Sequence, residues 1–129
     1  MKCSILSATI LITSLFTADL LAAPKAMITH NLTDTTTNAY VDGRAAPQPA
    51  WPNETTKVSW TIVKAGCRDH REEGICPAMI KMDIDSSSPI VVGTLYIDLE
   101  TGVITPAKIS ANGFTVEVNA PGEITVLKD

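Results

Sequence analysis

The chain has 129 residues, which favours a single domain, and a formal net charge of −4. A mildly acidic chain with no run of Lys or Arg is a poor candidate for a nucleic-acid-binding protein, because phosphate binding requires clustered positive charge. The chain also lacks a basic amphipathic segment of the kind that lies on a membrane surface. The expected partner is therefore a protein or a small molecule, and no cofactor is indicated.

Residues 1–22 are predicted to form a cleavable signal peptide. Lys2 supplies a positive charge, an apolar run follows, and small residues surround Ala22. The run is too short for a membrane anchor, and its flanks match an export signal. We expect cleavage after Ala22, because Pro24 disfavours cleavage one residue later. Residues 23–129 then form one secreted or periplasmic domain that does not insert into a membrane; its oligomeric state is left open.

The first part of this domain changes in composition. Residues 26–32 can form one strand, whereas residues 34–56 are rich in Thr, Asn, Ala and Pro. Proline has no N–H to donate to a strand ladder, so residues 34–56 are predicted to form a loop or an edge excursion. Trp51 lies in this segment. We keep it as a candidate binding residue, although such a ring more often folds back onto its domain.

From residue 57 onward, apolar and polar residues alternate, which indicates strands with one buried face. Gly93 is expected to mark a bulge or a close approach of two backbones. The apolar positions of three successive runs are Val58, Trp60 and Ile62, then Ala78, Ile80, Met82 and Ile84, and finally Leu95, Ile97 and Leu99.

Turn signals separate these runs and those that follow. Asn112-Gly113 predicts a tight hairpin, because both residues tolerate positive φ. Residues 120–123 fit a type II turn, after which residues 124–127 are predicted to close a terminal hairpin. A serine-rich β-turn is expected after Asp83. Short strands joined by such turns predict an all-β fold, an antiparallel β-sandwich or small barrel of about 6–8 strands.

One disulfide is predicted to support this fold. Two cysteines remain after the signal peptide, Cys67 and Cys76. An even number of cysteines in an exported chain indicates that they are paired. Closing so short a loop is expected to contribute roughly 2–3 kcal/mol.

The segment between the two cysteines is the most distinctive candidate binding site. A disulfide that holds both ends reduces the entropy lost on binding, which favours a recognition loop. The other interpretation is a solvated connection between strands, since mixed charges also keep a turn in water. Six of its eight residues can carry charge, namely Arg68, Asp69, His70, Arg71, Glu72 and Glu73.

Neither a metal site nor a catalytic site is predicted. Zinc requires several convergent His or Cys ligands, whereas His30 is the only other histidine and both cysteines are expected in the disulfide. The sequence has no G-x-S-x-G elbow, no phosphate-binding glycine loop and no H-E-x-x-H pair. We therefore expect a non-enzymatic protein. A small hydrolase that uses His30 or His70 remains an alternative.

Several short motifs are spread over the domain. Asn-x-Thr-Asp occupies residues 31–34, Asp-x-x-Thr-Gly lies at 98–102, and Asn-Gly-Phe-x-Val lies at 112–116. Together with Cys67 and Cys76 before two strands, this arrangement resembles a loose group of small, uncharacterised exported β proteins of intracellular γ-proteobacteria. The resemblance implies a bacterial, exported protein, and it implies neither an activity nor catalytic residues.

The favoured function is a non-enzymatic binding protein that presents loops on a β-sandwich. One alternative is an inhibitor of a secreted hydrolase that inserts residues 67–76 into its target. Another is the small, histidine-dependent hydrolase. The last is a structural subunit that donates its terminal strand, residues 124–127, to the sheet of a neighbour.

Overall fold

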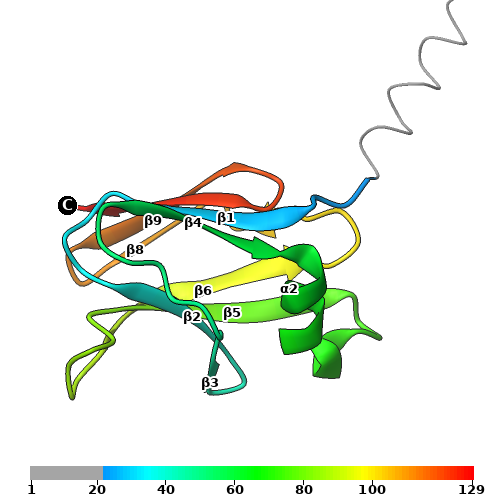
Figure 1. Cartoon of the computed structure of the whole chain (residues 1–129), viewed down its shortest axis with the longest axis horizontal. Helices are drawn as coiled ribbons and strands as arrows, with labels where there is room; N and C mark the ends of the chain where they lie inside the picture. Colours follow the sequence, from blue (N-terminus) through cyan, green and yellow to red (C-terminus); the bar gives the residue numbers. More distant parts are fainter. Residues whose placement is uncertain (1–21) are drawn as a thin grey trace, which may run out of the picture.

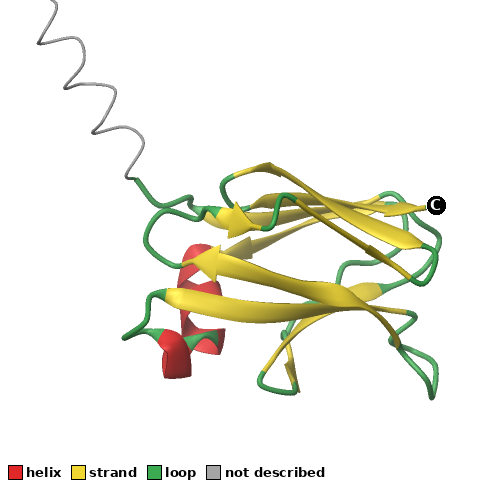
Figure 2. Ribbon diagram, turned by 180° about the vertical axis from the view of Figure 1, so that it is seen from behind, coloured by secondary structure: helices red, strands yellow, loops and turns green. Residues whose placement is uncertain are grey.

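The computed structural model describes residues 22–129. The predicted signal peptide, residues 1–22, lies outside the described residues apart from Ala22. Residues 22–129 fold into two five-stranded sheets that face each other as a sandwich (Figure 1, Figure 2). This confirms the prediction of an all-β sandwich with one disulfide, which joins Cys67 to Cys76.

The first sheet, called sheet A, has the strand order β4-β1-β10-β9-β8. Its strands are β1 (Ala26–Asn31), β4 (Glu54–Ser59), β8 (Lys108–Ala111), β9 (Phe114–Ala120) and β10 (Glu123–Lys128). All neighbours are antiparallel except β1 and β10, which run parallel. A parallel pair needs a long connection, and here the rest of the domain supplies it.

The second sheet, called sheet B, has the order β3-β2-β5-β6-β7 and is antiparallel throughout. Its strands are β2 (Thr37–Val41), β3 (Arg44–Ala45), β5 (Ile75–Met82), β6 (Ile90–Asp98) and β7 (Ile104–Thr105). The ten strands exceed the expected six to eight mainly because β3 and β7 have two residues each.

The core lies between the sheets and follows the predicted alternation, except that β5 ends at Met82 and the predicted Ile84 lies in the turn beyond it, only partly buried. On β5 the buried side chains come from every second residue, and β6 continues the pattern through Leu95 and Ile97. Sheet A contributes every second residue of β9 and β10. The buried residues of β5, β9 and β10 in this core are Cys76, Ala78, Ile80, Met82, Phe114, Val116, Ile124 and Val126.

The predicted turns are also present. Asn112 and Gly113 have φ of 55° and 89° and join β8 to β9 as a tight hairpin. Gly93 lies beside a register shift between β5 and β6, and a Cβ atom there would lie 3.2 Å from the Ile109 side chain. The expected bulge therefore occurs, whereas the close neighbour of Gly93 is the Ile109 side chain and not a second backbone. The Ser86 N–H donates to the Asp83 carbonyl at 3.1 Å in the serine-rich turn.

The prediction of a strand running through Trp60 and Ile62 is wrong. Strand β4 ends at Ser59, whose side chain caps helix α2 (Trp60–Gly66) by accepting from the Ile62 N–H. Figure 1 shows α2 following β4 at one edge of the sandwich. A short 3₁₀ helix, η1 (Arg68–His70), comes next. Burial of Trp60, whose indole N–H donates to the Leu99 carbonyl at 3.0 Å, outweighs the local strand preference of its β-branched neighbours. No helix within residues 22–129 combines the length and the apolar character needed to cross a bilayer.

The segment 34–56 is more ordered than a single loop. It contains β2 and β3, and Thr37 exchanges two backbone hydrogen bonds with Ala50, of 3.0 and 2.8 Å. The prolines follow β3, in the connection to β4, where no ladder N–H is needed. The edge position inferred from the prolines therefore applies to β3, whereas β2 has a neighbour on each side.

Candidate functional site

The disulfide loop, defined as residues 67–76, connects α2 to β5. The Cys67 N–H ends α2 by donating to the carbonyls of Val63 and Lys64. Gly74, at φ 75°, then turns the chain into β5, and its N–H donates to the His70 carbonyl at 3.0 Å. The disulfide joins the two ends across a Cα–Cα distance of 5.8 Å. The loop is thus closed by its own disulfide and by the hydrogen bond between Gly74 and His70.

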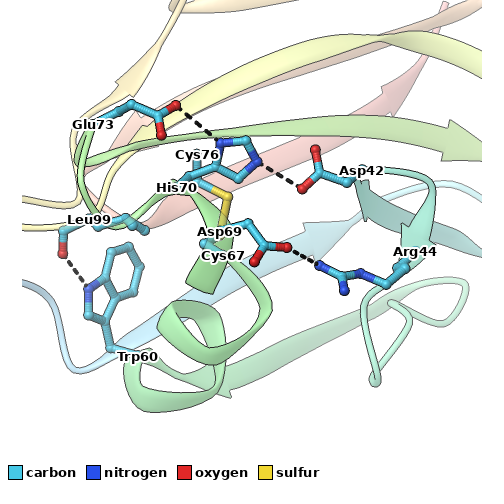
Figure 3. Close-up of a disulfide and its surroundings, with 9 residues drawn as sticks. All are labelled: Asp42, Arg44, Trp60, Cys67, Asp69, His70, Glu73, Cys76 and Leu99. Carbon is cyan, nitrogen blue, oxygen red and sulfur yellow. Dashed lines mark hydrogen bonds and ion pairs between the residues drawn. A yellow bond between two sulfur atoms is a disulfide. The ribbon is translucent and has the colours of Figure 1, made fainter.

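Two ion pairs attach the disulfide loop to the hairpin between β2 and β3. His70 Nε2 lies 2.8 Å from the Asp42 carboxylate, and Arg44 donates to the Asp69 carboxylate at 3.3 Å (Figure 3). Asp42 and Gly43 both have positive φ, of 53° and 80°, which is the geometry of a tight two-residue hairpin. Sequence reasoning found His70 and Asp69 but missed Asp42 and Arg44. The Asp-Gly pair was the signal that could have revealed this hairpin.

His70 is the central anchor of the disulfide loop. Its Nδ1 lies 3.4 Å from Glu73, so that both ring nitrogens face carboxylates. The hydrogen bond with Asp42 raises the pKa of His70 above its ordinary value of about 6.5, and Glu73 adds to this while partial burial opposes it. The charged imidazolium form is therefore favoured at a higher pH than in the unfolded chain.

This geometry predicts a pH-dependent anchor. The contact between His70 and Asp42 is fully present below pH about 6.5, and it is lost as the pH rises through the raised pKa of the folded state. Titration of the His70 ring by NMR is expected to give a lower pKa in Asp42→Asn than in the native protein, because the charged partner is removed. Asparagine also tolerates the positive φ at this position.

The matched control for this titration is Asp85→Asn, which removes the same charge from the exposed turn after β5. The pKa of His70 should be nearly unchanged in that variant. A His70 titration that is the same in Asp42→Asn and in the native protein would contradict the assigned anchor.

The remaining charged residues of the loop face solvent. Arg68, Arg71 and Glu72 are exposed and take part in none of the ion pairs formed within residues 22–129. The six predicted charged residues therefore divide into two groups. Asp69, His70 and Glu73 are held by side-chain contacts, and the other three are available to a partner.

Trp51 lies apart from this loop. It precedes β4, whereas the disulfide loop follows α2 beyond the other end of that strand. A six-residue strand spans about 20 Å, so the structure does not bring the two candidate sites together. The expected burial of the ring is incomplete, since 48 % of Trp51 is exposed.

His30 forms a second polar cluster, on the face of sheet A that points away from the core. Its Nδ1 lies 2.9 Å from Thr55 Oγ1, and its Nε2 lies 2.7 Å from a Glu123 carboxylate oxygen. The cluster therefore links β4, β1 and β10. None of these residues lines the cavity between the two sheets. Residues 22–129 contain no group of three or more His, Cys, Asp or Glu side chains placed to hold a metal ion.

Comparisons with known proteins add a family to this geometry. The profile of a family described as "T2SS substrate NttC" matches residues 1–129. Among solved structures, the crystal structure of the Legionella pneumophila type II secretion system substrate NttC is 39 % identical, with a TM-score of 0.80. The match covers 83 % of this chain and 100 % of that one. A search of curated proteins found no match.

Proposed function

The chain belongs to the NttC family of type II secretion system substrates, and on this premise we propose that it is a non-enzymatic binding protein whose disulfide loop recognises another protein. Family membership confirms the predicted secreted or periplasmic location. It also confirms, at the level of small secreted proteins, the resemblance found in the sequence. The binding function and its target are the proposal.

The observation that carries this proposal is the way in which the disulfide loop is held. The Cys67–Cys76 bond fixes its ends, and contacts with Asp42 and Arg44 fix its middle. A loop that is ordered before it meets its partner loses less conformational entropy on binding. Arg71 and Glu72, which these contacts leave exposed, are the side chains best placed to reach that partner.

The histidines support a non-enzymatic role. Both nitrogens of His70 face carboxylates, so the ring has no hydroxyl or thiol to activate. Thr55, His30 and Glu123 do have the connectivity of a nucleophile, a base and a carboxylate. They lie on the outer face of a sheet, outside the cavity between the two sheets, where a substrate would not be enclosed. We assign this cluster to linking three strands.

A hydrolase inhibitor would use the same loop. It would differ from a general binding protein in that its partner is a hydrolase that loses activity on binding. A strand-donating subunit is less favoured than the sequence suggested. Strand β10 lies between β1 and β9, so both of its edges are already hydrogen-bonded within the domain.

The test is capture from secreted and host-cell extracts with three immobilised proteins. The first is the native domain, and the second carries Arg71→Ser with Glu72→Ser. The third carries Lys108→Ser with Asp85→Ser, a matched control that removes one exposed charge of each sign outside the loop. All three proteins keep both cysteines, both ion pairs and the same net charge.

We expect a partner that binds the native and control proteins and is bound at least about tenfold more weakly by the loop variant. Loss of hydrolase activity in the captured partner would identify an inhibitor. Equal capture by all three proteins, or no partner for any of them, would contradict recognition by the disulfide loop.

A further inference from the structure

A cavity of about 260 Å³ opens between the two sheets at the edge where β4 faces β2 and β3. Its deep end is formed by core side chains of both sheets, Ile80 and Ile97 from sheet B and Ile124 and Val126 from sheet A. Ile62 and Val63 of α2 line it from one end. The cavity is therefore a continuation of the apolar core toward solvent.

Small side chains leave this space unfilled. Ala39 and Ala78 lie on the inner side of sheet B, and Ala46 and Ala50 follow at its edge. Larger side chains at these four positions would fill the cavity, whereas alanine leaves it open. The volume exceeds that of an apolar cavity of about 150 Å³ that admits benzene, so a hydrocarbon chain is a suitable occupant.

The mouth of the cavity carries positive charge. Arg44 and Arg68 are the charged residues of its lining, which contains no Asp or Glu. Arg44 is paired with Val41, a residue that packs against the core, and adjacent residues of paired strands point to the same face. Arg44 shares its charge with Asp69, whereas Arg68 is in no ion pair within residues 22–129. The mouth of the cavity is therefore positively charged, although the chain as a whole has a net charge of −4.

We propose that this cavity binds a single-chain fatty carboxylate, with the hydrocarbon chain between the sheets and the carboxylate at Arg68 and Arg44. Apolar surfaces leave water when the chain enters. The headgroup meets guanidinium donors, which suit a carboxylate through two parallel hydrogen bonds. The site shares Arg68 and the anchor Arg44 with the disulfide loop. Arg71 and Glu72, which the capture experiment changes, do not line the cavity, so the two proposals are tested through different residues.

The first experiment compares three probes that share one chain and differ in headgroup charge: decanoate, 1-decanol and decyltrimethylammonium. Each is titrated into the native protein by calorimetry below its micelle concentration. We expect decanoate to bind at least about tenfold more tightly than the cationic probe, with the alcohol between them. Absence of decanoate binding, or equal affinity for all three probes, would overturn the proposal.

Two variants then locate the probe. Ala46→Leu fills the mouth and is expected to weaken decanoate and decanol together, whereas Arg68→Gln is expected to weaken decanoate about tenfold and leave decanol unchanged. Lys108→Gln, an exposed cation outside the lining, is the control and should change neither. If Arg68→Gln and Lys108→Gln have the same effect on decanoate, the assigned headgroup site is wrong. Because these variants differ from those of the capture experiment, either proposal can fail alone.

Discussion

Replacing Cys67 and Cys76 together by alanine is expected to lower the free energy of unfolding by about 2–3 kcal/mol. The bond closes a short loop, with a sequence separation of 9, and so restricts the unfolded chain. Both cysteines are buried in the core, with 3 % and 0 % of their surface exposed. Without the bond, the loop depends on two ion pairs with exposed partners, and such pairs contribute little.

Urea denaturation of the double variant beside the native protein measures this loss. The control is Ser87→Ala with Ser88→Ala, two small changes in the exposed turn after β5, which should alter stability by less than about 0.5 kcal/mol. Amide hydrogen exchange should accelerate in residues 68–75 of the cysteine variant and much less in β9. Equal unfolding free energies for the cysteine variant and the native protein would contradict a stabilising disulfide.

The sandwich could be predicted from sequence because its strands and turns are determined by local residue patterns. On β5 the buried residues Ala78, Ile80 and Met82 recur at every second position, which is the period of a strand. Asn112-Gly113 likewise determines its hairpin locally, since both residues accept positive φ. Such features need no knowledge of distant parts of the chain.

The missed features depend on tertiary contacts. Thr61, Ile62 and Val63 are β-branched and locally favour a strand, but burial of Trp60 against Leu99 turns them into α2. The disulfide loop was identified as a candidate, whereas its anchors on the β2–β3 hairpin were not. Asp42 and His70 are 28 residues apart, and only the pairing of β2 with β5 brings them together. The alanine-lined cavity was missed for the same reason, because its walls come from both sheets.

Replacing Asn31 by alanine is expected to lower the free energy of unfolding by about 2–4 kcal/mol, because its buried amide makes four hydrogen bonds. Asn31 ends β1 and is fully buried, with 0 % of its surface exposed. Its amide donates to the carbonyls of Thr35 (2.8 Å) and Ala50 (3.1 Å), and its oxygen accepts from the Thr33 N–H (3.0 Å) and hydroxyl (2.7 Å). One side chain thus joins β1 to the turn after it and to the connection that precedes β4.

Alanine removes all four contacts and leaves the buried Thr33 N–H without its acceptor, which is why the expected loss exceeds that of an ordinary hydrogen bond. Urea denaturation measures it, with Asn119→Ala as the matched control, since Asn119 is exposed and accepts only from the Thr125 hydroxyl. That variant should lose less than about 1 kcal/mol. A similar loss in the two variants would mean that water replaces the Asn31 amide. Faster hydrogen exchange around Ala50 in Asn31→Ala alone would instead show that Asn31 holds the connection between β3 and β4, which contains Trp51, in place.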